Sequence, residues 1–292
     1  MGTLAGFEHV VREAEPLAPF TWLRLGGAAQ FFAEPTSLDE LQALVRAAHA
    51  AGLPVRVIGG GSNVLVRDEG VPGLVLHLAA AAFGKIEVNG RRVTAGGGAR
   101  LGHVISTAAR EGLAGLEAVV GIPGTVGGAL RTNAATHAGD IGQYTASATV
   151  MSHQGEIAQR RREDLRFGYR DSNLDDLVIL EASFDLEPGN AAVLTKRMQQ
   201  LWILKKSMQP ISDQNAACIF KDSGGMTAAS LIEEARMKGA RVGDAEVSER
   251  CANFITAGKR ATSREVLELI EVVRKGVAER TGAELETAIE VW

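Results

Sequence analysis

The segment Val57-Ile-Gly-Gly-Gly-Ser-Asn-Val-Leu-Val66 constrains the fold more than any other ten residues of the chain. An apolar run breaks into three glycines, a serine and an asparagine, and then becomes apolar again, which predicts a strand, a turn of bare backbone and a second strand. Glycines carry no side chain, so several peptide N–H groups can approach an anionic ligand. A similar loop, Gly121-Ile-Pro-Gly-Thr-Val-Gly-Gly128, follows later. Two such loops suggest a bound diphosphate cofactor.

Composition limits the class of protein. The 292 residues are 46% hydrophobic and 23% charged, as in an ordinary globular protein with two or three modest domains. No apolar run approaches the roughly 20 residues that span a bilayer, and the N-terminus has acidic residues and no signal-like apolar core. Two cysteines, Cys218 and Cys251, cannot form a disulfide framework. The composition therefore predicts a soluble, cytoplasmic protein with no membrane partner. We further expect a monomer without a metal site.

A nucleic-acid partner is not expected either. The net charge is −4, and no long basic run offsets it. The densest basic cluster, Arg160–Arg162, is followed by Glu163 and Asp164, which indicates a solvated loop.

Helices and strands alternate along the chain. Ser37-Leu-Asp-Glu40 fits a capping box that opens a helix with one buried face, and Val55 begins a strand. Ala228–Met237 predicts another helix, Thr262-Ser-Arg-Glu265 a second capping box before a long helix, and Glu284–Trp292 a final strand. The pattern predicts a mixed α+β chain in three parts, at residues 1–78, 79–209 and 210–292.

The triple glycine matches neither common nucleotide-binding fingerprint. The chain has no G-x-x-x-x-G-K-[ST] sequence, which excludes a P-loop, and Gly59-x-Gly61 lacks the third glycine of a Rossmann site. Taken alone, this turn is as consistent with a tight structural turn as with a phosphate-binding loop.

Three ordered motifs together are more specific. Val57–Val66 is followed by Gly121–Gly128 and then by Phe167-Gly-Tyr-Arg-Asp-Ser172. In order and spacing these motifs resemble the UDP-N-acetylenolpyruvoylglucosamine reductases, a family of flavoenzymes. The resemblance starts at Thr21-Trp-Leu-Arg-Leu-Gly-Gly27 and extends through Val247–Ile255 to the end of the chain. The chain looks like the shorter type of this family.

The resemblance implies a fold and a reaction. The fold would be α+β, with two FAD-binding subdomains of the PCMH or vanillyl-alcohol-oxidase type and a C-terminal α+β substrate domain. NADPH would reduce FAD, which passes hydride to the enolpyruvyl double bond of a UDP-sugar and yields UDP-N-acetylmuramate for peptidoglycan synthesis. The FAD diphosphate would lie on the glycine loops, held mainly by backbone amides. The cofactor-binding residues expected there are Ile58, Gly59, Gly60, Gly61, Ser62, Asn63, Gly121, Ile122, Gly124, Thr125 and Gly128.

The reaction requires a cation and a proton donor. Hydride addition to C3 leaves negative charge at C2 and on the carboxylate, so a fixed cation should lie beside the carboxylate and an acid should reach C2. Arg170 matches the family's arginine, and its planar fork suits a carboxylate; pairing with a structural aspartate is the alternative. Cys218 stands where the family has a serine donor, and a thiol (unperturbed pKa about 8.5) is the stronger acid; a buried apolar role is the alternative. Tyr169, Lys221 and Asp222 are expected as further substrate contacts.

Several C-terminal positions depart from the family pattern. Asp222 and Ser223 replace Asn and Pro, Met208 a lysine, Arg236 a glycine within Glu234–Gly239, and Cys251 a histidine. An ionised Asp222 would repel the substrate diphosphate. Ala288 occupies the position of a glutamate that assists the proton chemistry.

In a strand, Glu286 and Glu290 would lie on the same face as Ala288. Each would be two residues away from it, about 6.6 Å along the strand. That is too far for a hydrogen bond without rearrangement; ordinary solvated glutamates are the alternative. Two interpretations stay open. The chain is a working reductase that uses Arg170 and Cys218, or a flavin-binding relative with weakened or lost reductase activity.

Overall fold

The computed structural model describes residues 4–210, 215–223 and 225–292. The chain divides into two compact units whose segments alternate along the sequence. The first unit holds the N-terminal segment up to Glu15 together with Gln30–Gly60 and Pro72–Trp202, and the second holds Pro16–Ala29, Gly61–Val71 and Ile203–Trp292. One boundary therefore falls inside the triple glycine. The three-part division expected from the sequence stays a prediction.

A four-stranded sheet carries the first glycine loop. Its order is β1-β2-β5-β3, and the bounds are Val11–Pro16, Ala28–Ala33, Val71–His77 and Val55–Ile58 in that order. β3 and β5 are parallel, with Ile58 in register with His77. The glycines thus leave the sheet at the carboxyl end of a parallel strand, which is where open α/β sheets bind ligands. Helix α1 (Leu38–Ala50) packs on one face of this sheet.

The start of α1 confirms half of the predicted capping box. Ser37 Oγ accepts the N–H of Glu40 at 3.3 Å, as expected. The other half is wrong, because the Glu40 carboxylate accepts the N–H and the hydroxyl of Thr36 at 2.6 and 2.9 Å. Thr36 offers two donors where Ser37 would offer one. The Thr36 N–H is also the main cause that lowers the pKa of Glu40.

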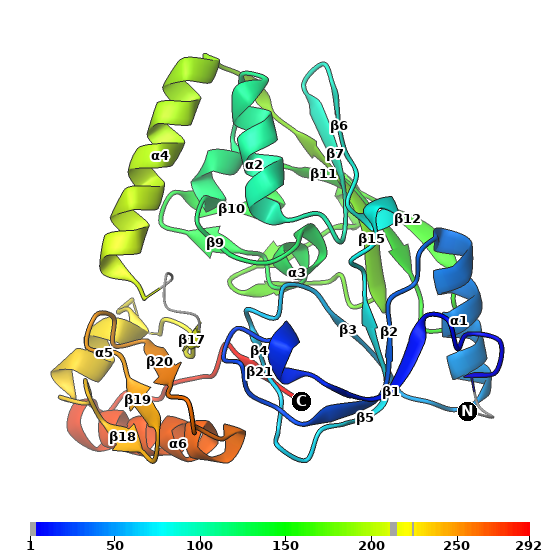
Figure 1. The fold of residues 1–292 in the computed structure, drawn as a ribbon. Helices are drawn as coiled ribbons and strands as arrows, with labels where there is room; N and C mark the ends of the chain where they lie inside the picture. The colour runs from blue at the N-terminus through cyan, green and yellow to red at the C-terminus, as the bar shows by residue number, and fades with distance from the viewer. Residues whose placement is uncertain (1–3, 211–214, 224) are drawn as a thin grey trace. The chain divides into compact units, whose positions relative to one another are not determined.

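A five-stranded antiparallel sheet forms most of the rest of the first unit (Figure 1). Its order is β12-β11-β15-β7-β6, and the bounds are Ile157–Arg161, Thr145–Met151, Val178–Asp185, Arg92–Gly96 and Ile86–Asn89. Helices α2 (Leu101–Arg110) and α3 (Val126–Arg131) share an apolar core with one face of this sheet. Helix α4 (Ala191–Met208) adds Met198 and Leu201 to the same core.

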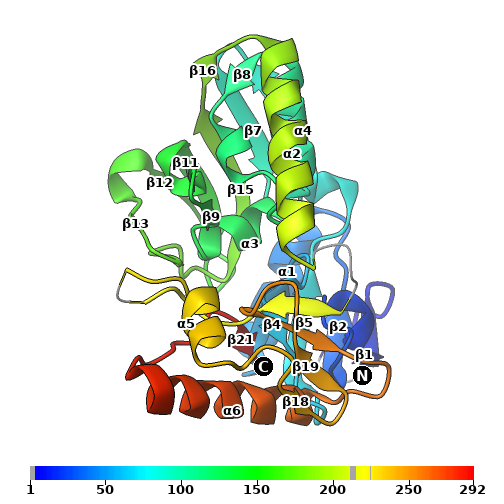
Figure 2. The same cartoon turned by 90° about the vertical axis from the view of Figure 1, so that its left-hand side faces the viewer.

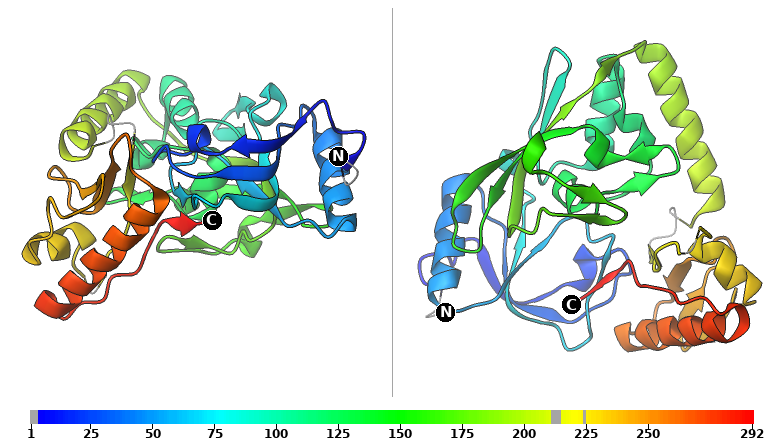
Figure 3. Two further views of the ribbon diagram at one scale, coloured as in Figure 1. Left: turned by 60° about the horizontal axis from the view of Figure 1, so that its bottom comes forward. Right: turned by 180° about the vertical axis from the view of Figure 1, so that it is seen from behind.

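The other face of the five-stranded sheet is polar, because side chains alternate across a strand. Figure 3 (right) views the sheet from behind. Thr94 and Ser183 face each other in register, with their hydroxyl oxygens 2.9 Å apart. Arg160 and Arg161 lie in the edge strand β12, all of whose residues are exposed. The loop predicted for Arg160–Arg162 is therefore wrong: backbone pairing with β11 places Arg160 and Arg161 in a strand, and Arg162 begins a 3-10 helix. Their side chains are exposed, as expected.

A four-stranded sheet and two helices build the core of the second unit (Figure 2). The order is β17-β20-β19-β18, and the bounds are Ala216–Cys218, Phe254–Ala257, Ala245–Val247 and Arg241–Val242. Helix α6 (Ser263–Thr281) packs against this sheet and against α5 (Ala228–Glu234). Thr262 and Glu265 form the reciprocal capping box that the sequence predicted.

Helix α5 ends three residues before the predicted Met237. After the cap residue Ala235, Arg236 takes a left-handed φ of +54°. The N–H of Arg236 donates to Glu233 O at 2.9 Å and that of Met237 to Ile232 O at 3.0 Å, which is a Schellman helix end. Met237 is buried, so the helical spacing of apolar residues extends beyond the end of the helix.

The tail is not the continuous strand predicted for Glu284–Trp292. Only Glu290–Val291 form a strand, β21, which is parallel to β4 (Val64–Leu65). Thr287 makes an isolated bridge to Phe220, and a bend at Ile289 separates the two pairings. The tail changes partner at this bend, so its side chains do not alternate across one face as the sequence suggested.

Short strand pairs complete the fold. They are β8 (Leu113–Ala114) with β16 (Glu187–Pro188), β9 (Ala135–Thr136) with β10 (Gly139–Asp140), and β13 (Phe167–Gly168) with β14 (Asp171–Ser172). Within the described ranges, no helix combines the length and the apolar character needed to cross a membrane.

Candidate functional site

The two glycine loops touch each other within the first unit. An ideal Cβ on Gly59 would lie 2.5 Å from Thr125 Oγ1, and one on Gly60 would lie 2.6 Å from Gly124 Cα. Both distances are far below van der Waals contact, so a side chain at Gly60 would have to move the opposite loop and one at Gly59 would have to displace the Thr125 hydroxyl. Two segments far apart in the sequence therefore form one surface of bare backbone.

The second loop is fixed on both sides of this contact. Gly124 O accepts the N–H of Leu101 at 3.1 Å, and the N–H of Val126 donates to Ala99 O at 2.9 Å. Gly124 has a φ of +116°, which favours glycine. Thr125 caps α3, and its Oγ1 accepts the N–H of Gly128 at 3.4 Å. These bonds set the shape of the loop before any ligand is considered.

The first loop continues into the second unit, where it meets the tail. Gly61 has a φ of +63° and accepts the N–H of Trp22 at 2.9 Å. The Asn63 side-chain amide donates to Ala288 O at 3.0 Å, and Asn63 O accepts the N–H of Glu290 at 3.0 Å. Asn63 therefore joins the end of the glycine loop to the end of the chain.

Two apolar residues of the predicted cofactor set lie in packed positions. Ile58 is the last residue of β3 and is 1% exposed. Ile122 packs against the core below the five-stranded sheet, and its N–H donates to Val119 O at 3.3 Å. Their side chains fix the loops, while their peptide groups belong to the loop backbone.

Arg170 lies in a two-residue turn between β13 and β14. Its φ is +56°, a left-handed conformation that costs a non-glycine residue about 1–2 kcal/mol. Ser172 Oγ donates to Arg131 O at 3.0 Å, and Asn133 Nδ2 donates to Gly168 O at 2.8 Å. The turn is thereby tied to the carboxyl end of α3, whose first turn carries the second glycine loop. Within the first unit, one short helix holds both motifs.

Asn133 is a structural residue that the sequence analysis missed. It is 4% exposed, and both ends of its amide are used, because Oδ1 accepts the N–H of Gly142 at 3.1 Å. Its φ of +42° is one that asparagine tolerates. An asparagine directly after a helix of small residues was the available signal. Tyr169, in contrast, is 55% exposed beside Arg170.

Cys218 ends strand β17 in the second unit, whereas Arg170 belongs to the first. The cysteine is half-buried and in register with Phe254. Just beyond it, Asn253 holds Phe220 at both ends: Oδ1 accepts its N–H at 2.9 Å, and Nδ2 donates to its carbonyl at 2.8 Å. This buried asparagine acts as an extra strand partner for the segment, and the sequence analysis also missed it.

Lys221 and Asp222 both have structural partners within the second unit. Lys221 Nζ lies 2.5 Å from Glu286 Oε1. Asp222 Oδ1 accepts the N–H of Ala228, the first residue of α5, at 2.8 Å. A carboxylate is favoured at a helix start, and an asparagine oxygen could accept the same bond. The exchange of Asn for Asp therefore preserves this contact.

Ala288 lies in the tail between two hydrogen-bonded segments. Its N–H donates to Ile219 O at 2.7 Å, while its carbonyl accepts from Asn63. Glu290 Oε1 accepts from the indole N–H of Trp292 at 2.9 Å, and Glu286 pairs with Lys221. Both glutamates are exposed and engaged by neighbours, in agreement with the alternative that they are ordinary surface residues.

Cys251 and Met208, two further positions that depart from the family pattern, lie in different environments. Cys251 is half-buried, and burial raises the pKa of its thiol. Met208, at the end of α4, is 60% exposed. Among the described residues, no group of three or more His, Cys, Asp or Glu side chains is placed to hold a metal ion.

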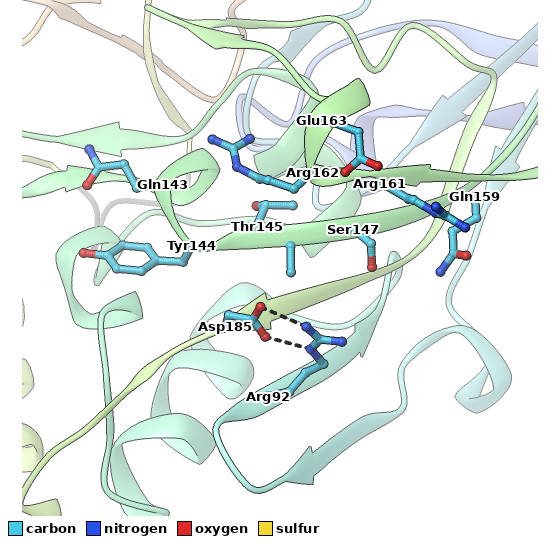
Figure 4. A pocket seen from close by; sticks show the side chains of 11 residues that line it. Arg92, Gln143, Tyr144, Thr145, Ser147, Gln159, Arg161, Arg162, Glu163 and Asp185 are labelled. Atoms are coloured by element: carbon cyan, nitrogen blue, oxygen red, sulfur yellow. Dashed lines mark hydrogen bonds and ion pairs between the residues drawn. The ribbon is translucent and has the colours of Figure 1, made fainter.

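A cavity of about 500 Å³ lies on the polar face of the five-stranded sheet (Figure 4). It is lined by Arg92, Gln143, Tyr144, Thr145, Ala146, Ser147, Gln159, Arg161, Arg162, Glu163 and Asp185. Arg92 donates two hydrogen bonds to Asp185, at 2.7 and 2.8 Å, and this pairing lowers the pKa of Asp185. Burial and the Glu117 carboxylate raise the pKa of Tyr144. None of the predicted site residues lines this cavity.

Comparison with known proteins gives matches along almost the whole chain. The model of the UDP-N-acetylenolpyruvoylglucosamine reductase C-terminal domain matches residues 209–292, and an FAD binding domain model matches residues 29–159. A UDP-N-acetylenolpyruvoylglucosamine reductase of Rhodopirellula baltica is 38% identical over 97% of this chain and 93% of its own. The corresponding reductase 2 of Symbiobacterium thermophilum is 42% identical over 97% of this chain and 92% of its own.

Solved structures agree. The crystal structure of the Thermus caldophilus reductase superposes with a TM-score of 0.83 at 35% identity, over 97% of this chain and 99% of that one. Wild-type Phl p 4.0202, a glucose dehydrogenase, shares the fold alone, with a TM-score of 0.50 at 15% identity over 64% of this chain and 43% of that one. The predicted α+β fold of the FAD-binding type is confirmed. By these matches the chain belongs to the UDP-N-acetylenolpyruvoylglucosamine reductase family and carries its FAD-binding domain.

Proposed function

We propose that the chain is an FAD-dependent, NADPH-using reductase of UDP-N-acetylenolpyruvoylglucosamine that forms UDP-N-acetylmuramate as a cytoplasmic monomer. The observation that carries the proposal is the contact between the glycine loops, Gly59 against Thr125 and Gly60 against Gly124. Glycines at this contact bring two loops close together and leave peptide N–H groups able to approach an anionic ligand. Family membership supplies the identity of the ligand.

The residues present fit an FAD diphosphate. The segments Gly59 to Asn63 and Gly121 to Thr125 contain five glycines, which have no side chains to cover neighbouring peptide N–H groups, and Gly128 stands in the first turn of α3. Bound FAD would supply the hydride-carrying group, reduced by NADPH. The protein's task toward the cofactor is to bind and orient it, and the backbone bonds at Gly124 and Val126 support the loop shape for that task.

Two side chains are proposed for the chemistry on the substrate. Arg170 binds the carboxylate and stabilises the negative charge that develops there; its turn is held by Ser172 and Asn133. The Cys218 thiol gives its proton to C2. Tyr169 and Lys221 are proposed to contact the substrate. Asp222 is proposed as a further substrate contact, and its carboxylate accepts the N–H of Ala228 at the start of α5.

A second candidate is a flavin-binding relative with weakened or lost reductase activity. Ala288 has no acid group where relatives are expected to have a glutamate. The neighbouring glutamates are occupied, Glu286 with Lys221 and Glu290 with Trp292. These contacts favour the second candidate over rescue by a nearby glutamate.

One assay separates the two candidates. Purified protein is checked for flavin absorbance, and NADPH oxidation is followed with and without UDP-N-acetylenolpyruvoylglucosamine. Substrate-dependent oxidation supports the reductase. Flavin-loaded protein that oxidises no NADPH in response to substrate supports the second candidate, and colourless protein that cannot be loaded with FAD contradicts both.

A further inference from the structure

The last residues of the chain lie between two segments of the second unit. On one side, the N–H of Lys221 donates to Glu286 O at 2.8 Å, and that of Ala288 donates to Ile219 O at 2.7 Å. On the other side, Trp292 N–H donates to Leu65 O at 2.9 Å. The tail is thus bound first to the segment that follows Cys218 and then to the segment that follows the triple glycine.

Asn63 holds the place where the tail changes partner. Its side-chain amide donates to Ala288 O at 3.0 Å, before the bend at Ile289, and its own carbonyl accepts the N–H of Glu290 at 3.0 Å, after the bend. A bend interrupts the strand ladder, so a side-chain donor at this point replaces a ladder hydrogen bond.

The peptide groups of Ala288 connect this contact to Cys218. Ala288 accepts from Asn63 through its carbonyl and donates through its N–H to Ile219, the residue next to Cys218. Asn253 fixes the following residue, Phe220, from the other side. A change at Asn63 therefore reaches the thiol-bearing segment through two hydrogen bonds.

We propose that the Asn63 side chain is a positioning residue for the tail and, through Ala288, for Cys218, while only its peptide N–H faces the cofactor. The role given to Cys218 rests on the proposed function. An alanine at position 63 removes the donor. An ionised aspartate keeps the shape of asparagine but places an acceptor against the Ala288 carbonyl.

The test compares Asn63→Ala and Asn63→Asp in the flavin-loaded full chain with Cys251→Ala, so that Cys218 is the single thiol. Three quantities are measured: hydrogen exchange of a peptide covering residues 286–292, the pH profile of Cys218 alkylation by iodoacetamide, and FAD affinity. The control is Gln42→Ala, because Gln42 Nε2 donates to Gly155 O at 2.7 Å in the first unit, a matched amide-to-carbonyl bond.

Both Asn63 variants should exchange the tail about fivefold faster, as expected for the loss of one hydrogen bond. Both should also shift the alkylation profile. Asn63→Ala should change FAD affinity less than about twofold, since the peptide N–H is kept, whereas the charge added by Asn63→Asp would repel a diphosphate, so FAD affinity is compared for the alanine variant. Gln42→Ala should change none of the three. Unchanged hydrogen exchange of the tail would overturn the proposal, whether or not FAD binding is weakened. If the alanine variant does not fold, the aspartate variant decides.

These readouts do not require turnover. A wild-type protein that binds FAD but reduces no substrate would contradict the proposed function, while tail exchange and alkylation would still decide the role of Asn63.

Discussion

The glycine loops of the first unit and the tail region of the second unit are built in different ways. Between the loops, the critical contacts are backbone against backbone or against the Thr125 hydroxyl, with no room for a Cβ at Gly59 or Gly60. Around the tail, side chains add to the backbone pairing, as Asn63 does with Ala288 and Lys221 with Glu286. A backbone site excludes substitution, whereas a side-chain site accepts any replacement that keeps the local bond. We therefore expect substitutions to be tolerated less between the glycine loops than around the tail.

The largest effect should follow from filling the loop contact. Gly60→Val places a branched side chain against Gly124 Cα, where even a Cβ would be 2.6 Å away. Overpacking of this kind costs about 3 kcal/mol, which is about a hundredfold in affinity. We expect protein with little bound flavin, measured by absorbance and by FAD titration of the apo-protein.

The control for this variant is another glycine. Gly102, in α2, would give a new Cβ nothing within 4 Å, so Gly102→Ala should keep FAD affinity and stabilise the helix by about 0.5–1 kcal/mol. Normal flavin content in Gly60→Val would contradict the picture of a closed backbone surface.

The next largest effect should come from Arg170. Arg170→Lys keeps the charge but loses the planar fork, so carboxylate binding in the transition state weakens. We expect turnover to fall about a hundredfold with flavin content unchanged, measured by steady-state NADPH oxidation and flavin absorbance. Loss of flavin instead would place this arginine at the cofactor and contradict its proposed role on the substrate.

A smaller gain is expected from restoring the family acid. If proton transfer limits the reaction, Ala288→Glu should raise turnover about tenfold. This gain is smaller than the rate increase of about a hundredfold or more that general acid catalysis usually gives. Single-turnover reduction of substrate by the reduced enzyme measures this step. Ala288→Gln has the same size without the acid and should give no gain. An equal gain in both variants would point to packing rather than chemistry.

The close contact of the glycine loops was predictable in kind from the sequence because it depends on the backbone rather than on side chains. Three consecutive glycines and the Gly121–Gly128 motif report directly that side chains are excluded there. The strand before Gly59 followed from the same local pattern, whereas its parallel pairing with β5 and the turn around Arg170 were not predicted. The roles assigned to these residues in cofactor and substrate binding stay predictions.

The contacts around the tail could not be predicted in this way. Asn63, Asn133 and Asn253 each bond to backbone far away in the sequence, and single asparagines give no periodic signal. The bend at Ile289 arises because the tail changes partner, which is a tertiary event. Local propensity and period do not contain such information.

The smallest effect concerns a departure that lies outside the chemistry. Arg236 stands at the left-handed end of α5, with a φ of +54°, at the position where the family sequence has glycine. Within the described residues, its side chain makes no hydrogen bond or ion pair in this exposed position. Arg236→Gly should therefore stabilise the protein by about 1 kcal/mol, since glycine adopts this conformation without strain. Thermal unfolding measures the change, and turnover should stay the same.

Arg236→Ala removes the same guanidinium but keeps the Cβ, so it should give no gain. If alanine stabilised the protein as much as glycine, removal of the guanidinium rather than relief of the backbone conformation would explain the gain. Position 236 would then resemble the side-chain contacts around the tail and not the glycine loops.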